Sequence, residues 1–141
     1  MSSGTAPRRK KAAAKRSHPA FFRISDEMRR ICVLLGAELE SFPEVTSKPM
    51  FGFLGYYRDG MIFAALPKTK ALGSPNSVIF KLNAAPKKVF DRADKDPSIK
   101  LSSHGMKGWH SLEIASELDI AHAQYWLVEA WRYAVKVKSK N

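Results

Sequence analysis

An Asp-Gly pair at residues 59–60 constrains the fold of this chain more than any other feature. It separates two runs of β-prone residues in the stretch MFGFLGYYRDGMIFAAL, residues 50–66. Glycine readily adopts the positive φ that a two-residue hairpin turn requires, so an Asp-Gly pair in this setting is a strong hairpin signal. The pattern predicts antiparallel strands over residues 51–57 and 61–66. Residues 45–51 are also expected to be extended, and Pro49 places that strand at a sheet edge or a bulge.

The aromatic residues of this hairpin could form either a binding surface or part of the core. Side chains alternate between the two faces of a strand, so they cannot all face one partner. We expect Phe51, Phe53 and Tyr57 to face the core, and Leu54 and Tyr56 to face away from it. A surface on which nucleic-acid bases stack needs several exposed rings together with nearby cations. Because only half of the rings could contribute, the pattern favours a half-buried hairpin at the centre of a small sheet.

Residues 26–40 are predicted to form the first helix. Ser25 is a suitable N-cap, and Asp26 and Glu27 place negative charge in the first turn, where the helix dipole favours it. Apolar residues recur at helical spacing and form one stripe: Met28, Ile31, Cys32, Leu35 and Leu39. On this stripe Cys32 is expected to be a buried structural thiol, because a reactive thiolate needs a polar, partly exposed setting.

The rest of the chain alternates between loop, strand and helix signals. The expected elements are a loop at residues 67–76, a short strand at 77–82, a short helix at 84–95, two extended pieces within 98–114 and a final helix at 120–136. Asn83 and Asp119 are expected to be the N-caps of these two helices. Strands that follow one another without intervening helices favour an α+β domain with an antiparallel sheet.

The net charge of +11 is concentrated near the two ends of the chain. Residues 1–19 contain no acidic residue and carry +6, and the last six residues carry +3, which leaves +2 for the residues between them. A segment so poor in large apolar residues cannot offset its ordering entropy, so residues 1–20 are predicted to be a disordered basic tail. Such a tail attracts nucleic acid or another polyanion without sequence specificity, and the alternative is a solvated tail without a partner. The cations expected to make these contacts are Arg8, Arg9, Lys10, Lys11, Lys15 and Arg16.

The composition also bears on the cellular compartment. A single cysteine cannot form an internal disulfide or a cysteine-cluster metal site. No apolar run approaches the roughly 18–20 residues that a membrane-spanning helix needs. The Arg pair near the N-terminus is not followed by the hydrophobic stretch of a secretory signal, and the basic segment lacks the amphipathic pattern of an organelle transit peptide. We therefore expect a cytoplasmic protein without a membrane partner.

The hairpin stretch resembles the signature of the TfoX N-terminal domain family, to which the YjbR-like proteins are related. The matching pieces are Met50-Phe51-Gly52, Gly55-Tyr56-Tyr57, Asp59-Gly60 and Met61-Ile62-Phe63-Ala64. VIFKL, which ends at Lys81, is similar to a later strand of the family. GWHSLEI and the helix that follows it, with Trp126, Trp131 and Tyr133, are similar to its closing strand and helix.

This resemblance carries expectations about both fold and function. It implies one α+β domain over residues 21–137, with an antiparallel sheet of about five strands in the order α-β-β-β-α-β-β-α. Residues 138–141 are then a basic C-terminal tail. Because TfoX is a regulator of natural competence, the resemblance also implies a binding or regulatory module.

The residues themselves contain none of the common catalytic patterns. The sequence has no serine elbow, no glycine-rich phosphate loop and no carboxylate pair with catalytic spacing. We therefore assign no catalytic residue, no cofactor and no metal site, and enzymatic activity is not supported.

Two other functions are kept as alternatives. One is a small-molecule or catalytic pocket between the sheet and the helices, formed by Tyr57, Lys81 and His110. The other is protein docking or self-association through the sheet or the last helix, where Trp126 is expected to be partly exposed. The candidate ligand-binding residues are Tyr56, Arg58, Lys81 and His110.

Overall fold

The computed structural model describes residues 21–101 and 108–135. The tails predicted at residues 1–20 and 138–141 lie outside these ranges, as do the six cations of the N-terminal segment. Their conformation and the domain boundaries therefore stay predictions.

Within the described residues the chain forms an α+β structure, as the sequence predicts. The strands of the main sheet, in spatial order, are β3 (Val45–Met50), β4 (Phe53–Arg58), β5 (Met61–Pro67), β7 (Ser77–Lys81), β9 (Trp109–Glu113) and β8 (Ile99–Leu101). All neighbours are antiparallel. A small second sheet pairs β2 (Phe21–Arg23) with β6 (Lys70–Leu72). The helices are α2 (Asp26–Glu40), α3 (Lys87–Lys95) and α4 (Glu117–Arg132). The main sheet thus has six strands where about five were expected.

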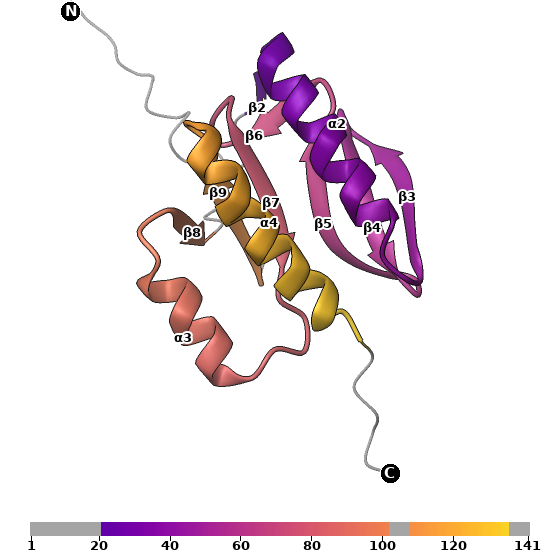
Figure 1. The fold of residues 1–141 in the computed structure, drawn as a ribbon, viewed down its shortest axis with the longest axis vertical. Helices are drawn as coiled ribbons and strands as arrows, with labels where there is room; N and C mark the ends of the chain where they lie inside the picture. Colours follow the sequence, from indigo (N-terminus) through magenta and orange to yellow (C-terminus); the bar gives the residue numbers. More distant parts are fainter. Residues whose placement is uncertain (1–20, 102–107, 136–141) are drawn as a thin grey trace, which may run out of the picture.

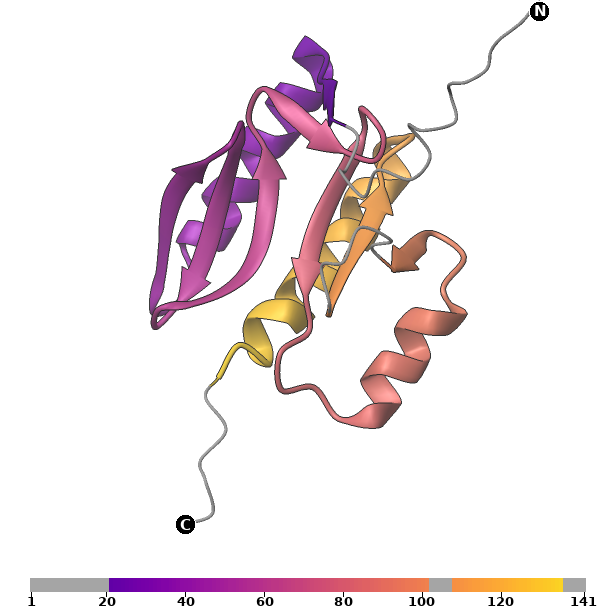
Figure 2. The same cartoon turned by 180° about the vertical axis from the view of Figure 1, so that it is seen from behind.

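Two of the helices cover one face of the main sheet. Figure 1 shows α2 lying over β4 and β5, and α4 lying over β7 and β9, and Figure 2 shows the same layers from the sheet side. Helix α3 lies beyond this layer, next to β8. The largest core cluster fills the space between helices and sheet and includes Phe63, Phe80, Leu112 and Trp126.

Helix α2 begins and ends where the sequence predicts. The hydroxyl of Ser25 accepts a hydrogen bond from the Met28 backbone N–H at 3.0 Å, which makes Ser25 the N-cap. The side chain of Cys32 is 4% exposed, so the expectation of a buried thiol is confirmed. Burial raises the pKa of this thiol to about 12, which leaves it protonated and unreactive at neutral pH.

The predicted Asp-Gly hairpin is also present. Asp59 and Gly60 have φ values of 51° and 85°, the two positive φ angles of a type I′ turn. A second turn of this kind joins β3 to β4, where Phe51 and Gly52 have φ values of 44° and 86°. Phe51 is 88% exposed there, so the expectation that it belongs to the core is wrong.

The expected orientation of strand β4 is confirmed for Phe53, which is 5% exposed in a core cluster, but is wrong for Tyr56 and Leu54. Tyr56 is 2% exposed and belongs to the core beneath the helices, with Leu54 packed against the same cluster. Phe53 lies in a smaller cluster with Ile79 that forms separately from this core. Tyr57 is half-buried and contacts Met50, which packs against the same smaller cluster as Phe53. The alternation was predicted correctly, but alternation alone does not say which face the helices cover.

Three elements begin or pair differently from the predictions. Residues 70–72, predicted to lie in a loop, form β6 and pair with β2. Helix α3 begins at Lys87 with Pro86 as its N-cap, whereas Asn83 donates a side-chain hydrogen bond to the Ile62 carbonyl. Helix α4 begins at Glu117, three residues earlier than predicted, in a capping box in which Ser116 is the N-cap and Asp119 the third helical residue.

The last helix corrects a further expectation. Trp126 is 2% exposed and stacks against Phe80 at a ring-centroid distance of 5.8 Å, so it is part of the core and not a partly exposed docking residue. Among residues 21–101 and 108–135 we find no helix with the length and apolar character needed to span a bilayer.

Candidate functional site between helices α3 and α4

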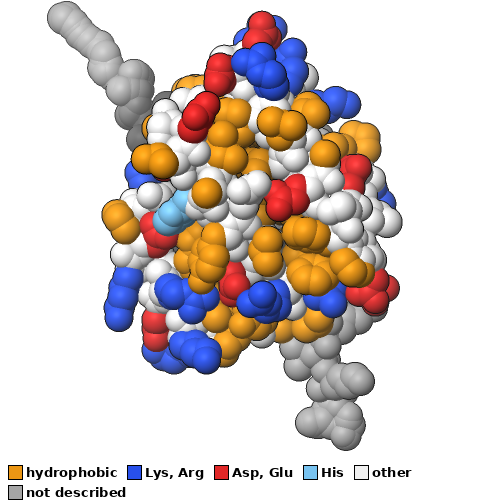
Figure 3. All heavy atoms as spheres, viewed as in Figure 1, with side chains coloured by type: hydrophobic (Ala, Val, Ile, Leu, Met, Phe, Trp, Pro, Cys, Tyr) orange, Lys and Arg blue, Asp and Glu red, His pale blue; other side chains and the backbone are white. Residues whose placement is uncertain are grey.

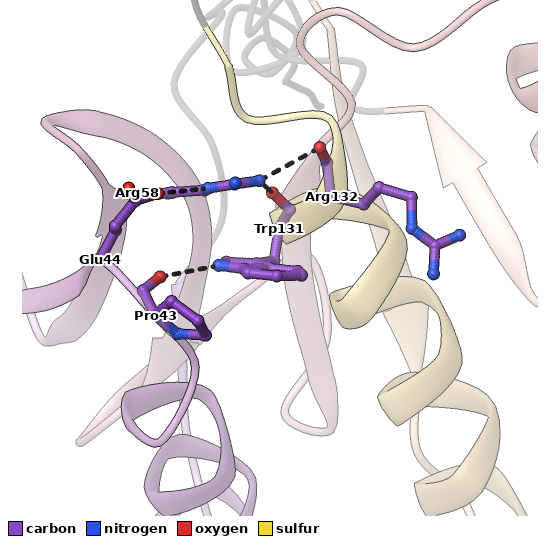
Figure 4. Close-up of polar contacts among 5 residues, drawn as sticks. All are labelled: Pro43, Glu44, Arg58, Trp131 and Arg132. Atoms are coloured by element: carbon purple, nitrogen blue, oxygen red, sulfur yellow. Dashed lines mark hydrogen bonds and ion pairs between the residues drawn. The ribbon is translucent and has the colours of Figure 1, made fainter.

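Of the four residues predicted to bind a ligand, Arg58 has a structural contact network (Figure 4). Its Nε pairs with Glu44 Oε1 at 3.1 Å, and its Nη1 donates to the carbonyls of Trp131 and Arg132 at 2.9 and 3.3 Å. The guanidinium also lies over the Trp131 ring, 4.4 Å from its centroid. Since the last carbonyls of a helix have no partners within it, Arg58 caps the C-terminus of α4.

Tyr56 likewise has a structural role, as part of the core between α2 and the sheet. Its hydroxyl lies under Gly36 of α2, and burial raises the pKa of Tyr56 to about 12, with smaller contributions from Glu40 and Cys32. The residue lines a cavity of ≈280 Å³ between α2 and strands β4 and β5. The outward orientation that made Tyr56 a candidate ligand contact is therefore not observed.

The structure does not bring Tyr57, Lys81 and His110 together. His110 stacks on Phe80 within the core at 5.4 Å. Lys81 follows Phe80 in β7, so its side chain points to the opposite face of the sheet and runs along Gly108. Tyr57 lies two strands away from Lys81. His110 therefore lies on the helix side of the sheet, whereas Tyr57 and Lys81 lie on the other face two strands apart, so the three residues do not line a shared pocket.

His110 is a buried histidine in an apolar setting. It is 1% exposed between Phe80 and Phe90, and among the described residues neither ring nitrogen has a hydrogen-bond partner. Burial lowers the pKa of His110 below its usual 6.5. The charge of Asp94 opposes this shift without cancelling it, as does the Gly108 backbone, which is close but makes no hydrogen bond of good geometry.

This lowered pKa predicts a loss of stability in acid. Below about pH 6.5 the unfolded chain binds a proton at His110 that the folded chain does not, so the free energy of unfolding falls by at most about 1.4 kcal/mol per pH unit. The loss ends once the pH passes the lowered pKa of the folded protein. We expect His110→Phe to remove this part of the pH dependence while keeping the stacking. Denaturant unfolding of the wild-type and His110→Phe proteins at several pH values measures this difference. Equal pH dependence of the free energy of unfolding in the two proteins would contradict the prediction.

A polar network that the sequence analysis missed links α3 to α4. Asp96 Oδ2 accepts a hydrogen bond from Trp126 Nε1 at 3.1 Å and lies 2.6 Å from His122 Nε2, while Oδ1 accepts from the Ser98 backbone N–H. Burial raises the pKa of Asp96, but these hydrogen bonds and the charge of His122 outweigh it, so the net pKa is below the usual value. The network holds the end of α3 against the middle of α4.

Next to this network, an open groove of ≈740 Å³ runs between the two helices. Its lining includes Lys88 and Arg92 from α3, and Tyr125, Glu129 and Arg132 from α4. Figure 3 shows Lys and Arg side chains gathered at the lower left and lower centre of this face, over α3 and the end of α4. Sequence analysis could have found only the Lys88 and Arg92 spacing of four residues, which puts both on one side of a helix.

The groove combines fixed cations with an exposed aromatic ring. The carboxylate of Glu129, which is 5% exposed, lies 3.3 Å from Arg92 Nη2 and 2.9 Å from Arg132 Nη1. Arg92 also lies over the rings of Tyr125 and Trp126, 5.8 and 5.6 Å from their centroids. Three cations and one carboxylate give the lining a net positive charge. Such a surface can bind anionic groups and stack planar ones.

The side chains that commonly bind metal ions do not cluster in the described ranges. Among residues 21–101 and 108–135 no group of three or more His, Cys, Asp or Glu side chains is placed to hold a metal ion.

Comparison with known proteins leaves the family open. No family model matches the chain, and neither the curated proteins nor the solved structures gave a significant match. The resemblance to the TfoX N-terminal domain family therefore stays a prediction based on the hairpin stretch.

Proposed function

We propose that this protein is a binding or regulatory module of the TfoX N-terminal domain type, and that it contacts nucleic acid through its basic N-terminal segment. The observation that carries the proposal is the distribution of charge. Residues 1–19 hold six cations and no acid, whereas residues 20–135, which include the whole described domain, carry a net charge of only +2. Clustered cations bind phosphates and release counterions, which gives sequence-independent, salt-sensitive affinity.

The positions of the two described chain ends bear on how the basic sequences can reach a nucleic acid. The first described strand, β2, lies toward one end of the molecule, and α4 finishes at the opposite end (Figures 1 and 2). The basic sequences that precede β2 and follow α4 thus join the domain at opposite ends.

Neutralising the N-terminal cations is expected to abolish most duplex DNA binding. In the tail-neutral variant, the full chain carries glutamine in place of Arg8, Arg9, Lys10, Lys11, Lys15 and Arg16. A protein with six phosphate contacts loses roughly 10³-fold in affinity between about 50 and 200 mM salt, and the tail-neutral variant should lose most of this salt dependence. Fluorescence anisotropy with a labelled duplex, titrated at several salt concentrations, measures both quantities.

A matched control removes the same charge from the folded domain. Its six substitutions to glutamine replace exposed cations away from the groove, which are Arg23, Arg29, Arg30, Lys68, Lys70 and Lys100. This control should keep most of the duplex affinity of the wild-type protein. Equal losses in the two variants would mean that overall charge, and not the N-terminal segment, drives binding. If the wild-type protein fails to bind at low salt, the nucleic-acid proposal is wrong.

Protein docking is a second candidate, favoured by apolar side chains on the outside of the helical layer. Val33 and Leu34 of α2 are 65% and 67% exposed, and Leu118 at the start of α4 is 85% exposed. Figure 3 shows hydrophobic side chains exposed over much of the helical face, and extensive apolar surface of this kind can serve as an interaction surface. Light scattering would test self-association through this layer, and a monomer at high concentration would count against it.

A further inference from the structure

We propose that the groove between α3 and α4 binds single-stranded nucleic acid, with its cations on the phosphates and Tyr125 stacked on a base. This inference rests on the proposed function, because it takes nucleic acid as the ligand and assigns the folded domain a contact that is separate from the N-terminal segment. Single-strand binding surfaces combine a positively charged groove with aromatic rings on which bases stack. The groove lining brings these two features together.

The stacking surface is Tyr125. Its side chain is 46% exposed, and its ring packs edge-on against buried Trp126, with the ring planes at 83° and the centroids 5.2 Å apart. Packing of this kind fixes the ring orientation before a ligand arrives and so lowers the ordering cost of binding. Tyr133, half-buried at the same groove, is a second aromatic residue within reach of the strand.

The cations are also held in place. Buried Glu129 accepts from one nitrogen of Arg92 and one nitrogen of Arg132, so the two guanidinium groups converge on the groove. Each guanidinium has five N–H donors, and the remaining donors can contact phosphate oxygens. The side chains of Arg92 and Arg132 are 44% and 55% exposed, so they reach solvent without leaving Glu129. Lys88, one turn before Arg92, extends the positive surface along α3.

The chemistry favours a single strand over a duplex or an acidic peptide. A base must present its face to stack on Tyr125, and a duplex keeps its base faces inside the stack. The carboxylates of an acidic peptide would meet the cations but offer no aromatic face to the exposed ring. The groove is open to solvent, so a nucleic-acid strand can enter it without a rearrangement of the helices.

The test uses the tail-neutral variant of the full chain, so that the N-terminal cations do not mask the groove. Fluorescence anisotropy with labelled oligo(dT) compares Tyr125→Leu with Tyr125→Phe, which keeps the ring. We expect Tyr125→Leu to weaken binding roughly tenfold and Tyr125→Phe to bind as the parent does. Thermal unfolding confirms that the variants are folded, since Tyr125 is exposed enough for both substitutions to be tolerated.

The charge contribution is tested with neighbouring lysines. Lys88→Gln removes a cation that lines the groove, and Lys87→Gln removes one that pairs instead with Asp91. Lys88→Gln should reduce the salt dependence, measured as the slope of log affinity against log salt, by about 0.7, whereas Lys87→Gln should leave it unchanged.

Three results would overturn the inference. The first is a tail-neutral variant that does not bind oligo(dT) at low salt. The second is equal affinity of the Tyr125→Leu and Tyr125→Phe proteins. The third is competition by polyglutamate as effective as that by unlabelled oligo(dT) at equal charge, which would identify an acidic peptide as the better ligand. The proposed function is judged separately, on duplex DNA with the N-terminal cations intact, so either proposal can fail alone.

Discussion

Replacing Arg58 with methionine is expected to lower the free energy of unfolding by about 2–3 kcal/mol. The substitution keeps much of the aliphatic stem but removes the ion pair with Glu44, the two hydrogen bonds to the α4 carbonyls and the contact with the Trp131 ring. The side chain of Arg58 is only 21% exposed, so solvent screens these interactions less than those of a surface pair. Denaturant unfolding followed by circular dichroism measures the change.

Two further variants show whether the geometry matters or only the charge. Arg58→Lys keeps the charge but cannot reach Glu44 and two carbonyls with one planar group, so an intermediate loss is expected. Arg30→Met is the matched control, because Arg30 makes a well-exposed pair with Glu27 three residues away. It should change stability by less than about 0.5 kcal/mol. If Arg58→Met lowers the free energy of unfolding no more than this control does, the contacts of Arg58 do not hold α4 in place. A role for Arg58 as a ligand contact would then gain support.

Replacing Gly36 with alanine is expected to destabilise the protein by about 1–3 kcal/mol, although the same change in an exposed helix stabilises by about 1 kcal/mol. The reason is the buried hydroxyl of Tyr56, because a Cβ on Gly36 would lie 2.1 Å from Tyr56 Oη. Helix and sheet must separate locally, or the Tyr56 ring must leave its position. Chemical denaturation determines the sign, and a stabilised Gly36→Ala protein would contradict the structure at this contact.

The contact can be isolated with a double-mutant cycle. Tyr56→Phe removes the hydroxyl, so the nearest remaining atom is the ring carbon Cζ, 3.2 Å from the added Cβ. A contact at 3.2 Å is tight, but the overlap is much smaller than at the 2.1 Å of the hydroxyl. The loss caused by Gly36→Ala should therefore be smaller in the Tyr56→Phe background, with a coupling of about 1 kcal/mol or more. Additive losses would show that the strain arises elsewhere.

Elements with local signals were predictable from the sequence. Ser25 caps α2 by accepting a hydrogen bond from the Met28 backbone, three residues away. Asp59 and Gly60 form the hairpin turn through their own positive φ angles. The chemistry that specifies such elements lies within a few residues, so a pattern read along the chain contains it. The α+β class followed from the order of these elements in the same way.

The candidate site was not predictable in this way, because its parts are distant in sequence. Trp126 and Asp96 are 30 residues apart, and Arg92 and Glu129 are 37 apart. Each of these residues has an ordinary helix or loop context, and nothing in the local pattern pairs them. The structural role of Arg58 was missed for the same reason, since the carbonyls that it caps lie 73 and 74 residues further along the chain.

The sequence by itself determined the hairpin, the first helix, the class of fold and the segregation of positive charge toward the chain ends. Each of these depends on residue type and on spacing over one or two turns or strands. Only the tertiary structure decided which face of β4 the helices cover, which places Tyr56 in the core beneath them, and which side chains meet between α3 and α4. The physical reason is that strand alternation and helical periodicity specify relative orientation within an element. The packing of distant elements then determines which face loses its contact with water.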